Sequence, residues 1–562
     1  MRLSRVVWFG LLAGVLITSP VIALFYLAEQ VVGLPFAPFD LLDWLTRNLP
    51  GDVITKGIDT MVGLIHDLNL GETSSTAKKL ETFSALAAFF SGGVGAGAVL
   101  FALLEWAATR FDLRAQQHEV IRYAPGILGG LLVSLPVILI SRNVNVTAET
   151  SDFTNTVWLS LVFGAWGAAI TWLFFRLWQE PARAMSGTEP DRAISVEPVL
   201  AEQISRRNFL IRVGGVTATL TVIGAGLGRY LEYREAENYK KLIARRRAQA
   251  AAIAQELPNA GDPVLPAPGT RPELTPLEDH YRIDINVRPL ELDAETWRLH
   301  ITGLVDRPMD LTIDDLRDNY DPLHQYVTLA CISNSVGGDL TSTIQWIGAR
   351  LKDVLEEAGI KAAGRYALIR SADGFHETLD LALLEEDDRI MLCYSWEGIP
   401  LLHKHGFPLR IYIPDRYGMK QPKWITDIEI SDQYAEGYWV KRGWDSVAQM
   451  RATAVVDVAA SDMPFERAGQ TFVPVGGIAH AGARGISKVE VQVDDGEWVE
   501  TQLRSPLSET TWVIWRYDWP FEEGQHIFRV RCYEKDSTPQ IETSSGSHPS
   551  GATGYDRMSQ TF

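Results

Sequence analysis

The chain has 562 residues, of which 46% are hydrophobic and 22% are charged, and its net charge is −18. This length exceeds that of one ordinary domain, and the acidic balance excludes extensive binding to nucleic acid, because phosphate contacts need clustered Lys and Arg. Three cysteines exclude a disulfide scaffold, and the scarcity of charges before residue 230 predicts a membrane half followed by a soluble half.

Four uncharged runs in the first half are long enough to cross a bilayer core, which takes about 20 apolar residues. A fifth run is shorter and rich in glycine, and the arginines at its two ends can reach the interfaces. Arginines also gather before the first run and in the second and fourth connections. The positive-inside rule therefore predicts an inner-membrane protein with everything after Arg229 on the periplasmic or extracellular side. The five predicted spans are residues 6–27, 83–104, 123–141, 155–175 and 212–229.

Arg206 and Arg207 stand just before the fifth run and resemble a twin-arginine export signal. Ordinary positive-inside charge is the alternative interpretation. The twin-arginine pathway moves folded proteins, which suits a chain that receives a bulky cofactor before export. No small-residue cleavage site follows closely, so we expect the fifth helix to remain as an anchor.

Histidine placement argues against a haem in the anchor. None of the 11 histidines lies within the predicted spans, and the nearest, His66 and His118, lie in connections. A membrane haem needs axial histidines that face the bundle interior. We therefore expect the helices to serve as tether and docking surface. Their packing would use small residues such as Gly92, Gly93, Gly95 and Gly97.

The soluble half divides by its hydrophobic pattern. Short apolar runs alternate with amphipathic helical patterns, such as residues 351–358, which is typical of an α+β domain. Period-2 alternation follows, clearest at 488–493, and predicts a β-sandwich. The predicted segments are an all-helical anchor at 1–229, a charged helix and Pro-rich linker at 230–276, an α+β domain at 277–444, a β-sandwich at 445–540 and an irregular tail at 541–562.

Cys331 ends an extended run and precedes a turn-forming loop with two glycines. A buried free cysteine that acts as a small hydrophobe is the commoner case, and a nucleophile or a soft metal ligand are the alternatives. Cys393 and Cys532 lie in apolar, strand-like runs, so we expect core positions for both. A disulfide between them is the alternative in an oxidising compartment.

A second cluster of polar residues occupies 405–424. It gathers His405, Arg410, Lys420 and Lys423 around a strand and a Gly turn. Arg offers a fork of donors and Lys a point charge, and together they suit a phosphate group. A solvated surface cluster is the alternative, but it does not account for the interleaved Gly and Pro.

Together these two motifs resemble the sulfite oxidase family of molybdopterin enzymes. The first runs from Thr328 through Cys331 to Asn334, with Gly337-Gly338 and residues 346–351 downstream, and the second is the 405–424 block. The resemblance covers about 277–533. It implies a C-terminal immunoglobulin-like domain of the dimerisation type, and it leaves the membrane half outside.

By this resemblance Cys331 is the thiolate ligand of a molybdenum whose other ligands are the pterin dithiolene and oxo groups. The implied contacts to the pterin and its phosphate are His405, Arg410, Gln421, Pro422 and Lys423, and by a looser match Tyr281, Arg282, Asn286, Ser371 and Asp373. Tyr434, Tyr438 and Arg442 follow the domain and either line a substrate pocket or pack between domains.

Two departures from the family pattern bear on the substrate. Sulfite oxidases of animals and plants carry arginines directly after the Cys-x-x-Asn motif, whereas this chain has Ser335 and Val336. The N-terminal pterin motif appears only as Asp284-Ile285-Asn286, which is nearer to the bacterial methionine-sulfoxide-reductase branch. The expected substrate is therefore a small oxyanion or a sulfoxide.

The resemblance implies two-electron oxygen-atom transfer at the metal. No haem-attachment motif or iron–sulfur cysteine set occurs in the sequence, so we expect a separate carrier, a cytochrome or a haem-bearing membrane subunit. The rival hypotheses are a non-catalytic, membrane-tethered binding protein and a cysteine hydrolase that uses Cys331 and His405.

Overall fold

The computed structural model describes residues 2–68, 70–111, 118–144, 150–177, 197–251 and 256–562. Its contacts divide the chain into two compact units. The first comprises Met1–Asn48 and Leu80–Lys241, and the second comprises Leu49–Lys79 and Leu242–Phe562. The second unit thus includes a connection between two long apolar helices as well as the soluble half.

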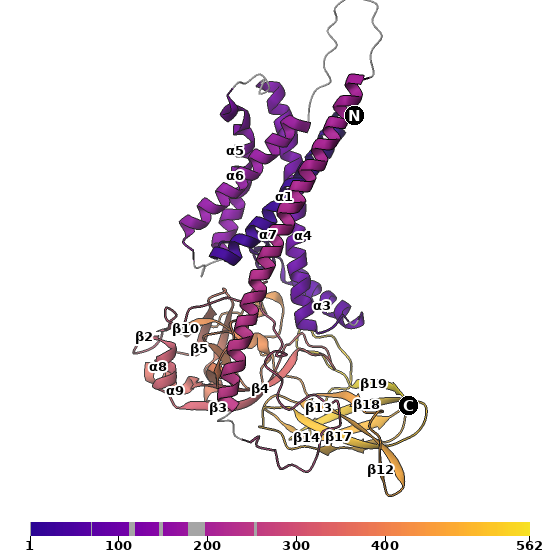
Figure 1. Cartoon of the computed structure of the whole chain (residues 1–562). Helices are drawn as coiled ribbons and strands as arrows, with labels where there is room; N and C mark the ends of the chain where they lie inside the picture. The colour runs from indigo at the N-terminus through magenta and orange to yellow at the C-terminus, as the bar shows by residue number, and fades with distance from the viewer. Residues whose placement is uncertain (1, 69, 112–117, 145–149, 178–196, 252–255) are drawn as a thin grey trace, which may run out of the picture. The chain divides into compact units, whose positions relative to one another are not determined.

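The first unit consists of long helices, drawn from indigo to magenta in Figure 1. Five described helical segments are long and apolar enough to cross a membrane, judged by length and composition, and each overlaps a predicted span. The helices are α1 (Arg2–Val32), α2 (Ala37–Asn48), α4 (Thr73–Arg110), α5 (Glu119–Val144), α6 (Asp152–Leu177) and α7 (Glu197–Ala251), of which α4 and α7 continue into the second unit.

Small residues let the helices of this unit approach closely. A Cβ added to Gly130 on α5 would lie 2.0 Å from the Phe163 carbonyl oxygen of α6, so only glycine fits there. Of the predicted small-residue row on α4, Gly93 and Gly97 pack against Thr18 and Gly14 of α1. Gly92 and Gly95 face open space. The predicted packing through small residues is therefore confirmed for two of the four glycines.

The fifth apolar run and the charged stretch after it form one helix, α7. The side chains of Arg206 and Arg207 lie outside the described residues, as do parts of two arginine-rich connections, 112–117 and 178–196. The twin-arginine interpretation stays a prediction.

The α+β domain expected at 277–444 contains two sheets, with strand orders β2-β1-β10-β5-β6 and β3-β4-β7-β8, and β9 also pairs with β7. The strands are β1 (Leu299–Gly303), β2 (Met309–Leu311), β3 (Pro322–Ala330), β4 (Thr341–Arg350), β5 (Tyr366–Ser371), β6 (His376–Asp380), β7 (Met391–Trp396), β8 (Ile399–Pro400), β9 (Arg410–Tyr412) and β10 (Ile425–Ser431). The helices are α8 (Ile313–Asp318), α9 (Leu351–Ala358) and α10 (Leu383–Glu386), with single 3-10 turns η1 (His403–His405), η2 (Gly418–Lys420) and η3 (Val440–Arg442).

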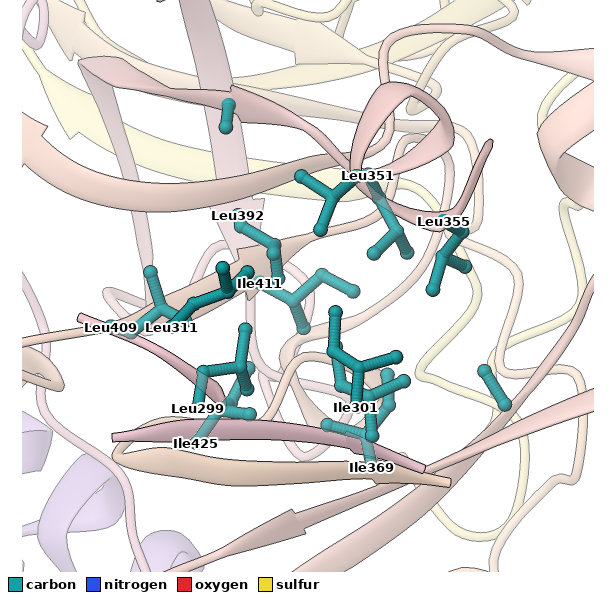
Figure 2. Packing of buried hydrophobic residues seen from close by; sticks show 14 of the residues in the cluster. Leu299, Ile301, Leu311, Leu351, Leu355, Ile369, Leu392, Leu409, Ile411 and Ile425 are labelled. Atoms are coloured by element: carbon teal, nitrogen blue, oxygen red, sulfur yellow. The ribbon is translucent and has the colours of Figure 1, made fainter. Parts of the chain in front are cut away.

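One apolar core joins both sheets and the amphipathic helix α9. Leu351 and Leu355 are buried at i and i+4 on one face of α9, which ends at Gly359 in the left-handed region. Figure 2 shows their side chains in one cluster with Leu299 of β1 and Ile425 of β10. This core fixes the strand ends and loops on which the predicted site residues stand.

The C-terminal domain has two antiparallel sheets, ordered β11-β13-β17-β16, with β12 beside β13, and β15-β14-β18-β19. Trp515 from the first sheet and Phe528 from the second are fully buried in one core, to which both sheets contribute. The strands are β11 (Thr453–Ala459), β12 (Phe465–Arg467), β13 (Gln470–His480), β14 (Ile486–Val493), β15 (Trp498–Glu500), β16 (Gln502–Leu503), β17 (Val513–Pro520), β18 (Gln525–Glu534) and β19 (Asp556–Thr561).

Two segments differ from expectation. The tail is expected to be irregular or extended and to lie outside the sandwich at 445–540, but its last residues form β19, which pairs antiparallel with β18, Met558 opposite Phe528. An edge strand pairs through its backbone and needs no apolar run, so composition hides it. The Pro-rich segment expected as a linker packs on the sandwich domain, where buried Arg504 donates to the carbonyl oxygens of Asn259 and Val264.

The connection that belongs to the second unit contains α3 (Gly51–Asp67) and the first residues of α4. Gly51 lies so close to η3 that an added Cβ would be 2.6 Å from the Arg442 Cα atom. The backbone N–H of Thr73 donates to Asp339 Oδ2 at 2.7 Å. These contacts attach the connection to the α+β domain.

Candidate cofactor site

Cys331 lies directly after β3 at the start of a tight turn. Its backbone N–H donates to the Leu340 carbonyl, and its own carbonyl accepts from Asn334 N–H. Asn334 Oδ1 accepts from the Leu340 N–H at 2.9 Å, which closes the loop. The Cys331 side chain is only 8% exposed, and its Sγ lies 3.0 Å from Ser333 Oγ. Burial raises the pKa of this thiol above its ordinary value.

Tyr281 belongs to the same small apolar cluster as Cys331. Its hydroxyl points at Gly418, where an added Cβ would lie 3.1 Å away. Burial raises the pKa of Tyr281 well above its ordinary value, and the nearby Cys331 adds to this effect. The phenol therefore stays protonated beside the thiol.

Three cations converge on the carboxylate of Asp284, whose side chain is 2% exposed. Arg282 Nε lies 2.7 Å from Oδ2, Lys423 Nζ lies 3.0 Å from Oδ2, and Lys78 Nζ lies 3.3 Å from Oδ1. Burial opposes ionisation, but these cations outweigh it and hold the pKa of Asp284 well below its ordinary range. Three cations thus lie close together around one buried carboxylate, an arrangement that suits an additional anion.

Arg410 and Lys423 face one another across an antiparallel bridge. Arg410 is 4% exposed, donates to the His405 carbonyl at 3.2 Å and stacks 4.7 Å above the Trp346 ring. Gly406, at φ 107°, lets the turn after His405 pack on both cations, since an added Cβ would lie 3.0 Å from Lys423 Cβ. The interleaved glycine noted in the sequence thus permits a buried cation pair.

Several buried polar atoms near these cations have no hydrogen-bond partner. They are His280 Nδ1, His405 Nε2, Ser371 Oγ and Gln421 Oε1. The two imidazoles lie 4.8 Å apart, and burial lowers the pKa of both, so each is neutral and keeps one donor and one acceptor. An unsatisfied buried polar atom costs roughly 1–3 kcal/mol, which favours a polar, planar ligand with donors and acceptors along its edge.

The remaining predicted contacts lie in two connected turns. Asn286 Nδ2 donates to Asp373 Oδ2 at 3.0 Å, and Asp373 Oδ1 accepts from the Phe375 N–H. The Ala372 N–H donates to the Trp424 carbonyl, which joins this turn to the segment that carries Lys423. The Gln421 and Pro422 backbone belongs to that same segment, which runs beside β9. The structure therefore brings the predicted pterin contacts into one region of the domain.

Tyr438 lies beside the turn that carries Asp373, since its backbone N–H donates to the His376 carbonyl, while Tyr434 and Arg442 lie further along the same segment. Tyr434 is 46% exposed and rests its ring 5.7 Å from that of Tyr366. Tyr438 is buried against Phe375, and the Arg442 guanidinium lies 3.6 Å above the Tyr438 ring. These contacts are those of aromatic packing, and a role in a substrate pocket stays a prediction.

A cavity opens instead beside the Cys331 turn. Its lining includes Asn334 to Gly338 together with Ala330, Thr341, Tyr417, Arg271, Thr453, Val455, Ile478, His480 and Ala552. Arg271 is paired with Asp457 at 2.8 Å, and burial lowers the pKa of His480 to about 4. The lining therefore mixes polar and apolar side chains, and the charge of Arg271 is already offset.

Nothing in the sequence identifies Lys78 or His280 as a site residue. Lys78 stands next to Lys79 before an apolar run, where a basic pair is typical of a membrane interface. His280 lies in a charged, turn-like stretch with no motif around it. Both residues reach the site only through tertiary contacts.

The cation cluster predicts a pH dependence for anion binding. Burial lowers the pKa of Lys423 to about 8, against the opposing effect of Asp284, while Arg282 and Arg410 lower it further. Lys423 is thus charged below about pH 8 and loses its proton above it. Sulfate stays a dianion throughout, so cofactor-free protein should bind it about tenfold more weakly at about pH 9.5 than at about pH 7.5. Calorimetry measures the effect, and a profile that is equally steep in Lys423→Met would contradict it.

Comparison with known proteins places this region in a family. Residues 286–439 match the model of the oxidoreductase molybdopterin-binding domain. Mitochondrial sulfite oxidase of Macaca fascicularis is 27% identical over 289 residues, which cover 44% of this chain and 53% of that protein. The chain thus spans about half the length of this relative. The sulfane dehydrogenase SoxCD of Paracoccus pantotrophus aligns at a TM-score of 0.43 and 20% identity, over 49% of this chain and 78% of that chain.

The oxidoreductase YuiH of Bacillus subtilis (strain 168), itself described as uncharacterized, is 31% identical over 157 residues, which cover 28% of this chain and 76% of YuiH. The resemblance seen at Cys331 and at 405–424 and the matched residues of the domain model fall in the same part of the chain. The chain belongs to the sulfite oxidase family of molybdopterin-binding oxidoreductases.

Proposed function

We propose that the protein is a membrane-anchored molybdopterin-dependent oxidoreductase that carries out two-electron oxygen-atom transfer. The observation that carries this proposal is a buried thiol at Cys331 and a buried cation at Lys423 within the matched residues 286–439, together with the ion pairs that Lys423 and Arg282 make to Asp284 just ahead of them. The thiol suits a soft metal, and the cations suit the phosphate of the cofactor.

The residues divide into three roles. Cys331 would ligate the metal. Arg282, Arg410 and Lys423 would hold the phosphate, while the unpaired atoms of His280, His405, Ser371 and Gln421 would bind the pterin edge. When bound, the group supplies a metal that cycles between states two electrons apart. The chain itself contributes position, exclusion of water and, at Tyr281, a phenol that keeps its proton.

The loop after Cys331 favours a neutral sulfoxide as the substrate over an oxyanion such as sulfite. Ser335 and Val336 occupy the positions of the arginines of sulfite oxidases, and Arg271 is offset by Asp457. His480 is uncharged above about pH 4. A sulfoxide needs hydrogen-bond donors but no net positive charge, so turnover should be higher with methionine sulfoxide and a reducing dye than with sulfite and an oxidising dye.

The anchor supports a location at the inner membrane with the catalytic domain on the periplasmic side. Five apolar helices of sufficient length and the arginine-rich connections are the support for this orientation. Electrons would pass to or from a separate cytochrome or haem-bearing membrane subunit. The C-terminal sandwich would be of the immunoglobulin-like dimerisation type.

A cysteine hydrolase is less compatible with the site. A nucleophilic cysteine needs an adjacent histidine and a lowered pKa. Cys331 instead contacts Ser333, and burial raises its pKa, while the His405 ring contacts His280 and Trp396. A purely non-catalytic binding protein would have no need of this buried cation cluster.

Metal and pterin analysis of the purified full-length protein tests the proposal. We expect near-stoichiometric molybdenum, the fluorescence of an oxidised pterin, and an optical spectrum without a Soret band. Protein from cofactor-competent cells that lacks both molybdenum and pterin would overturn the proposed function. A Soret band that copurifies with this chain alone would overturn the separate carrier.

A further inference from the structure

Lys78 reaches the cation cluster from the connection between two apolar helices. It lies in the second turn of α4, and its side chain is 12% exposed. Its Nζ donates to the carbonyl oxygens of Asp284 and Asn286, at 3.1 Å and 3.0 Å, besides its ion pair with the Asp284 carboxylate. Both Lys78 and the cluster belong to the same compact unit.

Lys78 is the third cation on one buried carboxylate. Asp284 also pairs with Arg282 and Lys423, so three positive charges lie within contact distance of its two oxygens. Three cations held close together in a nearly dry site repel one another, and an additional anion bound among them would reduce that repulsion. This convergence makes the cluster a suitable site for a phosphate group.

Lys78 also braces the turn that carries a predicted pterin contact. The Asn286 carbonyl accepts from Lys78 Nζ and, at 3.5 Å, from Arg282 Nη2. The Asn286 side chain in turn donates to Asp373. One ammonium group thus holds two backbone carbonyls of the 284–286 turn.

We propose that Lys78 is a positioning residue of the cofactor site, which supplies a third cation toward the cofactor phosphate and clamps the 284–286 turn. This inference rests on the proposed function. Helix α4 continues to Arg110 and contains one of the five apolar segments, so the helix that carries Lys78 is itself a candidate membrane span. Through Thr73, the same helix also holds Asp339 in the loop after Cys331. The first residues of α4, which belong to the second unit, are thereby part of the cofactor site.

The test compares two neighbouring lysines in the full-length protein. Lys78→Met removes the charge and keeps the aliphatic stem, whereas Lys79→Met makes the same change on an exposed side chain one residue further along. We expect Lys78→Met to lose pterin about tenfold faster on dilution, as measured by pterin fluorescence and molybdenum content, because one charge-assisted contact is gone. Lys79→Met should behave as wild type, and Lys78→Arg should restore most of the retention.

Thermal unfolding separates a cofactor contact from a merely structural one. In protein made without the cofactor, Lys78→Met should unfold at a slightly lower temperature than wild type, because its ion pair and two carbonyl contacts are lost. In loaded protein the decrease should be clearly larger, because the contact with the bound anion is lost as well. Equal destabilisation of both forms, or unchanged pterin retention, would overturn the role of Lys78. Wild-type protein that never holds pterin would overturn the proposed function instead.

Discussion

Replacing Cys331 by serine should reduce turnover to background and leave the fold intact. A thiolate is a polarisable ligand that donates electron density to the metal, whereas a serine oxygen is a harder ligand that alters this electron density. The substitution changes one atom in a side chain that is 8% exposed. A hydroxyl can keep the contact with Ser333, which is made at 3.0 Å by the thiol. The measurement is steady-state turnover with artificial dyes, beside circular dichroism and molybdenum content.

Cys393 provides a matched control for this experiment. It is also a free, buried thiol in the α+β domain, fully inaccessible to solvent, and burial raises its pKa to about 12. Cys393→Ala should cost some stability, on the order of 1 kcal/mol for a small core truncation, and keep both molybdenum and turnover. Substantial turnover in Cys331→Ser would remove Cys331 as the metal ligand.

Local patterns were sufficient to predict the parts of the fold that depend on local sequence. The apolar spans follow from hydropathy, and α9 follows from Leu351 and Leu355 at helical spacing. The hairpin of β14 and β15 follows from its alternation and its Asp-Asp-Gly turn. By contrast, β19 consists mostly of polar residues and is held by backbone pairing, so its side-chain pattern does not predict a strand.

The candidate site shows the same division. Cys331 and Arg410 lie in motifs with a chemical meaning, and the structure places both on buried loops and strands of one domain. The sequence does not show that Asp284 is the shared partner of several cations, because those cations approach it only in the folded protein. Lys78 is more than 200 residues away from that carboxylate in sequence. Such contacts depend on tertiary structure, and a single sequence carries no signal for them.

The second large effect is expected from neutralising the cation pair of Arg410 and Lys423. Each residue would make charge-assisted hydrogen bonds worth roughly 1.5–3 kcal/mol to a buried anion, so Arg410→Gln with Lys423→Gln should weaken cofactor retention by about 100-fold or more. The two side chains share one site, and the combined loss should differ from the sum of the single losses. Molybdenum and pterin per polypeptide are the measured quantities.

The cofactor-free form of this double variant makes the result specific. Arg410 and Lys423 are both buried near other cations, so removing their charges relieves repulsion, while the loss of the Arg410 contact over Trp346 costs about 0.5–2 kcal/mol. The fold should therefore survive as the cofactor is lost. The control is Lys352→Gln with Arg370→Gln, which removes two positive charges from exposed ion pairs of the same domain and should leave loading unchanged. Full molybdenum loading in the Arg410 and Lys423 variant would mean that this cluster binds a different anion, whereas equal loss in the control would mean that overall charge, and not this site, governs loading.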